Sequence, residues 1–117
     1  LDETSDVGGV EVLTAILKEA NVETLRKMAD KFRERNPRSA VAVLACVVDE
    51  RPMLIASVTD DLVKRDIKAG DLVKFVATPL GGGGGGRPTL AQAGGKDASK
   101  LDEALGSVVG WVEEKLK

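Results

Sequence analysis

The sequence predicts an α/β domain: a small mixed sheet of three to four strands with helices on both faces. A length of 117 residues is typical of a single domain with one buried core. The segment Ala40 to Val48 is apolar in both of its alternating sets, as in a strand that is covered on each side. The segments from Val22 to Arg35 and from Leu101 to Leu116 repeat apolar residues at spacings of three and four, which indicates helices.

The N-terminal part predicts one strand followed by one helix. A glycine pair at residues 8–9 forms a turn before a strand over residues 10–17, which is rich in β-branched and apolar side chains. Asn21 is expected to cap a helix that runs over residues 22–35. Pro37 ends this helix, because a proline disfavours helical backbone at the residue before it.

The middle of the chain predicts an antiparallel hairpin. Strands over residues 40–48 and 53–58 are joined by a tight turn over residues 49–52. Pro52 suits the start of a strand, where a missing N–H group costs little. Cys46 is expected to be a small core residue.

The helices that follow are marked by polar residues at their ends. Thr59 is expected to cap a short helix that opens with Asp60 and Asp61, since acidic side chains suit the positive end of a helix. A second helix begins near Ala69, and Thr78 and Pro79 close it.

The C-terminal part predicts a short strand and a last helix. The strand covers residues 90–93, and Ser99 with Asp102 is expected to form a capping box at the start of the helix. Trp111 lies on the apolar stripe of this helix, so we interpret it as a core residue in preference to a base-stacking platform.

The segment from residue 81 to residue 95 is the most unusual part, and we expect it to be a glycine-rich loop. Six consecutive glycines are followed by Arg87, and a further glycine pair ends the segment. Three interpretations stay open: a flexible linker, a device for close packing, or a nest of backbone N–H groups that binds an anion beside Arg87.

The composition excludes several functions. The chain has no histidine, no tyrosine and one cysteine, so it lacks the usual groups for a nucleophilic triad or imidazole acid–base catalysis, and we expect no metal site. Hydrolytic chemistry would have to rest on carboxylates alone. No long apolar run or signal peptide is visible, which predicts no membrane contact. The net charge of −2 means that any nucleic-acid surface must be a local patch. The missing initiator methionine suggests a fragment of a longer chain.

Several segments resemble a known family. The sequence GGGGRPTLAQAGG from Gly83 to Gly95, followed by KLDEAL from Lys100 to Leu105, resembles the extreme C-terminus of bacterial alanyl-tRNA synthetases. The segments LRKMADKFRER, LACVVDERPMLIASVTDDLV and AGDLVKFVATPLGG are similar to the same C-terminal module. That module is similar to the DHH-associated domain of DHH phosphoesterases, where a histidine typically follows the glycines in place of Arg87.

The resemblance implies that this chain is a C-terminal domain and not itself an enzyme. The parent would be an ATP-dependent alanine-tRNA ligase of the cytoplasm that uses ATP and magnesium, with a zinc-dependent editing domain. The module would bind the outer corner of alanine tRNA and help the aminoacylation and editing domains act on one tRNA. In relatives, a preceding helical portion contributes to a homo-oligomer.

The candidate RNA contacts fall into two groups. One group surrounds the glycine segment, and the other lies on and just after the helix over residues 22–35, although charges on that helix are more typical of a solvated face. The expected residues are Gly83, Gly84, Gly85, Gly86, Arg87, Gln92, Lys96, Lys100, Lys27, Lys31, Arg35 and Arg38. Two alternatives stay open: the substrate-binding domain of a DHH phosphoesterase or exonuclease, and a structural docking or dimerisation module.

Overall fold

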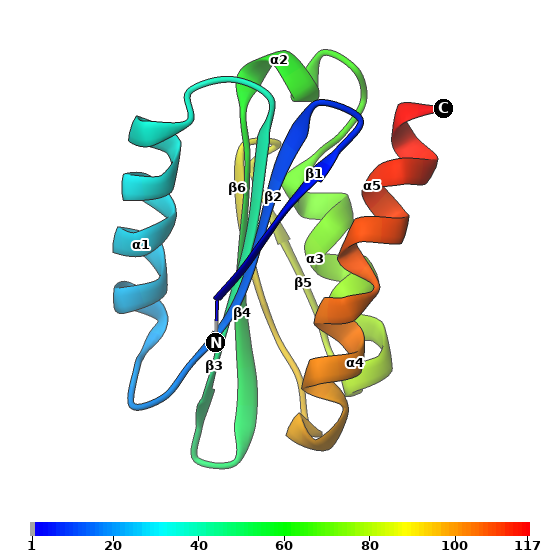
Figure 1. The fold of residues 1–117 in the computed structure, drawn as a ribbon. Helices are drawn as coiled ribbons and strands as arrows, with labels where there is room; N and C mark the ends of the chain where they lie inside the picture. Colours follow the sequence, from blue (N-terminus) through cyan, green and yellow to red (C-terminus); the bar gives the residue numbers. More distant parts are fainter. Residues whose placement is uncertain (1) are drawn as a thin grey trace.

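The fold is built on a six-stranded sheet. The computed structural model describes residues 2–117, and the strands lie in the order β1-β2-β3-β4-β6-β5 (Figure 1). Strands β2 and β3 are parallel, and every other neighbouring pair is antiparallel. The mixed sheet is confirmed, but three to four strands is wrong. The strands are β1 (Asp2–Val7), β2 (Val10–Leu17), β3 (Ala40–Val48), β4 (Arg51–Val58), β5 (Gly83–Gly86) and β6 (Leu90–Gly94).

Helices cover both faces of the sheet, as predicted. Helix α1 (Val22–Arg35) packs on β3 and β4 from one side. Helices α3 (Ala69–Ala77), α4 (Leu101–Gly106) and α5 (Val108–Leu116) lie on the other side (Figure 1). The short helix α2 (Asp60–Val63) caps one end of the sheet, and the 3-10 turns η1 (Thr78–Leu80) and η2 (Ala98–Lys100) precede β5 and α4. None of the helices described between residues 2 and 117 has the length and apolar run that crossing a membrane requires.

Strand β3 occupies the centre of the core. Its residues 40–46 are all buried, which confirms a strand covered on both faces. Val41 and Val43 pack toward α3, α4 and α5, whereas Leu44 and Cys46 pack toward α1. Burial raises the pKa of the Cys46 thiol, in keeping with a core position.

The first helix follows the sequence closely. Asn21 accepts the backbone N–H of Thr24 on its Oδ1 at 2.9 Å, so the predicted cap is confirmed. Leu25 and Ala29, four residues apart, are fully buried against the sheet. One face of α1 is therefore fixed against the sheet, and the charged faces are left outside.

Strand β1 was not predicted. Its sequence, DETSDV, is polar and offers no apolar alternation, because β1 is an edge strand that pairs only with β2 through the turn at residues 8–9. The β3–β4 turn is also tighter than predicted. It comprises only Asp49 and Glu50, at φ of 52° and 67°, and Arg51 and Pro52 already belong to β4.

Hydrogen bonds among Ser39, Thr59 and Asp61 fix the start of α2. Thr59 is the residue that precedes this helix, but its hydroxyl donates to Asp61 Oδ1 at 2.6 Å instead of capping the backbone. Asp61 also accepts the backbone N–H of Ser39 at 2.9 Å and the Ser39 hydroxyl at 3.0 Å. Burial alone would raise the pKa of Asp61, but these hydrogen bonds outweigh it and lower the pKa.

The C-terminal helix differs from the prediction in two ways. The capping box is wrong: Asp97 accepts the backbone N–H and the hydroxyl of Ser99, at 2.9 and 2.6 Å, and these bonds lower the pKa of Asp97. Ser99 lies within the 3-10 turn η2, and the residue that precedes α4 is Lys100, which forms no side-chain cap. The single helix is also two helices joined at Ser107. Trp111 is half-buried: it packs against the core, as predicted, and against the exposed Phe75.

Candidate nucleic-acid interface

The glycine run forms a strand in place of the expected loop. Gly83–Gly86 is β5, the edge of the sheet, and it pairs antiparallel with β6. A Cβ on Gly84 would lie 2.5 Å from the Cα of Ala93, and one on Gly82 would overlap the carbonyl oxygen of Gly94. Gly83 meets nothing within 4 Å. Alternate glycines thus let β5 approach β6 more closely than any side chain allows, which supports the packing interpretation and contradicts the flexible linker.

The β5–β6 turn is anchored on both sides by backbone hydrogen bonds. Within the turn, Arg87 N–H donates to Leu90 O at 2.9 Å. The N–H of Ala69, at the start of α3, donates to Pro88 O at 2.7 Å, and Val58 N–H donates to Thr89 O at 2.9 Å. The backbone of Arg87 is therefore fixed between β4 and α3, while its side chain is exposed.

A groove lies beside this turn, on the face of the sheet that carries α1. Helix α1 packs on β3 and β4 and leaves β6 and β5 uncovered on this face, so the groove opens over those two strands. Arg26 Nη2 donates to Gln92 Oε1 at 3.0 Å and so links α1 to β6. We call this hollow the glycine-strand groove. Its volume is about 320 Å³, and it is lined by Arg26, Ile55, Gly85, Gly86, Arg87, Leu90, Ala91 and Gln92.

The structure brings part of the expected set together and adds one residue. Gly85, Gly86, Arg87 and Gln92 all line the groove, and Arg26 joins them without having been predicted. On a helical wheel, Arg26 lies at the border of the buried face that contains Leu25. This position is the one feature of the sequence that could have pointed to Arg26. Its partner is 66 residues away on a strand whose position the sequence did not give.

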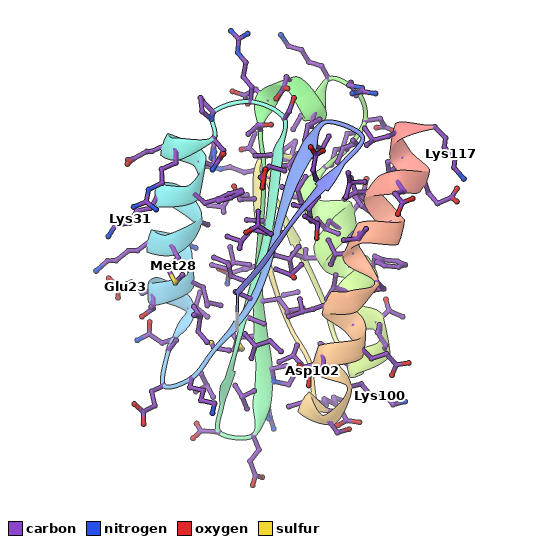
Figure 2. All side chains as sticks on the ribbon, viewed as in Figure 1. Glu23, Met28, Lys31, Lys100, Asp102 and Lys117 are labelled. Atoms are coloured by element: carbon purple, nitrogen blue, oxygen red, sulfur yellow. The ribbon has the colours of Figure 1, made fainter. Side chains whose placement is uncertain are left out.

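A row of basic residues follows the exposed side of α1. Lys27, Lys31 and Arg35 are spaced by four residues, so their positions rise by about 6 Å per step along the helix. Figure 2 shows Lys31 directed away from the sheet. Lys27 lies 3.9 Å from Glu23, but both side chains are exposed, so this ion pair is weak and leaves Lys27 available. Arg38 is exposed just beyond the helix.

Charge is concentrated in this part of the chain. Residues 22–38 carry six basic and three acidic side chains, although the whole chain has a net charge of −2. The glycine-strand groove has two arginines and no acidic residue among its lining side chains. The row on α1 (Lys27, Lys31 and Arg35) and the glycine-strand groove lie on the same side of the sheet, and we call the two together the α1 face.

Lys96 and Lys100 lie elsewhere. Lys96 follows β6 at the end opposite Arg87, where its N–H donates to Leu80 O at 2.8 Å and its side chain borders a separate hollow. Lys100 belongs to η2, close to Asp102 at the start of α4 (Figure 2). Gly83 and Gly84 belong to β5 but do not line the glycine-strand groove.

The comparisons with known proteins agree on one family. Residues 9–114 match the model of the DHHA1 domain. An alanine-tRNA ligase of Nitrosomonas eutropha is 48% identical over 116 residues, which are 99% of this chain and 13% of the relative. The corresponding ligase of Geobacillus kaustophilus is 53% identical over 95% of this chain and 12% of the relative. The chain thus spans about an eighth of the length of these curated relatives.

A solved structure agrees with the sequence relatives. The C-Ala domain from Aquifex aeolicus alanyl-tRNA synthetase superposes with a TM-score of 0.82 at 30% identity, and the match covers 97% of each chain. The fold described above is therefore the fold of that domain.

Proposed function

This chain belongs to the DHHA1 domain family, in the branch found in alanyl-tRNA synthetases, and from this premise we propose that it is the tRNA-binding C-terminal domain of an alanine-tRNA ligase. The observation that carries the RNA-binding part is the α1 face. There, a local excess of positive charge lies beside a groove lined by arginines and bare glycine backbone.

The mechanism of binding is electrostatic, with a contribution from shape. Lys27, Lys31 and Arg35 contact successive phosphates of a folded RNA, because their spacing along α1 suits a strand that runs beside the helix. Arg87 contacts the phosphate that enters the glycine-strand groove, since a guanidinium matches phosphate with two parallel hydrogen bonds. Such contacts position the RNA without reading its sequence.

The domain contributes by being attached to other tRNA-binding parts. In a ligase whose aminoacylation and editing domains each hold the tRNA, a modest additional site at the outer corner raises overall affinity through effective concentration. Aminoacylation, with ATP and magnesium, and zinc-dependent editing belong to those other domains of a cytoplasmic enzyme. Among the residues the structure describes, no three potential metal ligands gather at one point.

A binding titration of the 117-residue chain tests this proposal. The ligands are full-length alanine tRNA, an acceptor-stem minihelix that lacks the outer corner, and unstructured single-stranded RNA, each at two salt concentrations. We expect the full tRNA to bind most tightly and to lose affinity as salt rises. A variant with Lys27, Lys31 and Arg35 changed to alanine is compared with the unmodified chain and should lose this preference.

The other outcomes separate the alternatives. Preference for single-stranded RNA would favour the substrate-binding domain of a phosphoesterase. Absence of binding to all three RNAs would contradict the proposal and leave a structural docking or dimerisation module.

A further inference from the structure

The polar side chains of the glycine-strand groove present mainly hydrogen-bond donors. Arg26 has donors only, so the amide oxygen of Gln92 must face it across their 3.0 Å hydrogen bond. The Gln92 NH2 group is then directed away from Arg26, where it can donate to a ligand. Arg87 adds a second guanidinium at the end of the groove. A ligand that fits these groups must offer acceptors.

The floor of the groove suits a flat ligand. Ile55 is 1% exposed, Leu90 is half-buried, and Gly85 and Gly86 have no side chains, so their peptide planes are open to contact. A volume of about 320 Å³ is near the lower end of ligand pockets. The groove has room for one nucleotide, whereas a base pair would have to remain outside.

Charge selects further among flat ligands. No acidic side chain lines the groove, and among residues 4–117 neither Arg26 nor Arg87 forms an ion pair within the chain. Both guanidinium groups are therefore available to an anion.

The hydrogen-bond donors of the groove also distinguish between purine bases. Guanine presents two adjacent acceptors, O6 and N7, whereas adenine places an amino donor next to N7. Donors of the groove would meet that amino group donor to donor.

We propose that the glycine-strand groove takes one unpaired guanine of the bound RNA. Its O6 and N7 accept from the Gln92 amide and the Arg26 guanidinium, its ring lies on the Gly85–Gly86 backbone, and its phosphate contacts Arg87. This inference rests on the proposed RNA-binding function and adds a base preference to it. Arg26 and Gln92 become the residues that read the base.

Short RNAs test the preference directly. The isotope-labelled chain is titrated with adenine pentanucleotides whose central base is guanine, hypoxanthine, 7-deazaguanine or adenine, and amide shifts are followed by NMR. Hypoxanthine keeps O6 and N7, while 7-deazaguanine lacks N7. The guanine and hypoxanthine RNAs should bind about tenfold more tightly than the other two, the discrimination typical of one paired contact to a base edge. The shifts should centre on Gly85, Gly86 and Gln92.

Variants separate base reading from phosphate contact. Gln92→Ala and Arg26→Lys should remove the preference, and Arg26→Lys does so while it keeps the positive charge. Arg87→Ala should weaken all four RNAs equally, and Lys31→Ala, outside the groove, should keep the preference. Spectra of the free variants confirm that each one folds.

Two results would overturn the inference. Equal affinity of the unmodified chain for the guanine and adenine RNAs would make the groove a phosphate contact only, and shifts outside the groove with every RNA would remove it from the site. Either result leaves tRNA binding intact, because that function is measured separately with the full-length tRNA. Failure of the chain to bind that tRNA would count against both proposals.

Discussion

The close approach of β5 to β6 means that alanine substitutions at two neighbouring glycines, Gly83 and Gly84, should affect stability differently. We expect Gly84→Ala to destabilise the protein and Gly83→Ala to be tolerated, although the residues are adjacent and neither has a positive φ. At Gly84 the new methyl group would meet β6, whereas at Gly83 it would meet nothing within 4 Å. The comparison therefore isolates steric fit from the general preference of the chain for glycine.

The magnitude follows from the overlap. A Cβ on Gly84 would lie 2.6 Å from the Cβ of Ala93, about 1 Å inside a favourable carbon contact. Relief of this overlap moves β5 away from β6; overpacking of this kind costs about 1–3 kcal/mol. Each β5–β6 hydrogen bond that breaks adds about 1 kcal/mol. The free energy of unfolding should fall by about 2–4 kcal/mol for Gly84→Ala.

Urea-induced unfolding, followed by circular dichroism, measures this difference. The urea midpoint of Gly84→Ala should fall clearly. The free energy of unfolding of Gly83→Ala should stay within about 0.5 kcal/mol of that of the unmodified chain or rise slightly, because alanine restricts the unfolded state. Equal stability of the two variants would refute the steric explanation of the glycine run.

Three further changes test other parts of the structure. Asp61→Asn removes a carboxylate whose lowered pKa stabilises the fold above pH about 4; the variant should lose about 1–2 kcal/mol at pH 7, and the difference in the free energy of unfolding should shrink as the pH falls through the lowered pKa of Asp61. Asn21→Ala removes the cap of α1 and should cost about 1 kcal/mol, a fall of about 4 °C in Tm by calorimetry. Lys31→Ala should weaken tRNA binding and reduce the log-log salt slope by about 1, whereas Lys115→Ala on α5 should leave both unchanged.

The elements that the sequence predicts correctly are those in which side chains carry the signal. Helix α1 repeats buried residues at helical spacing, and β3 is apolar on both faces because it lies at the centre of the sheet. The two edge strands escape prediction because both lack that signal. Strand β1 is a polar strand at one edge of the sheet, and β5 has no side chains, so neither offers an apolar alternation to detect.

The candidate site is predictable only in part, for a related reason. Arg87 and Gln92 stand out because they neighbour the glycine run, but the contribution of Arg26 depends on how α1 lies over the sheet. A loop over residues 81–95 would allow Lys96 to lie near Arg87, as the sequence predicts. Since β5 and β6 form an extended hairpin, the two residues lie at opposite ends of it.

Chemical-shift mapping of the labelled chain with full-length alanine tRNA tests the central claim most directly. The account predicts that perturbed amides gather on the exposed side of α1 and around the glycine-strand groove, with those of α4 and α5 unchanged. Perturbations confined to α3, α4 and α5, with α1 unaffected, would contradict it and place the RNA on the opposite face of the sheet.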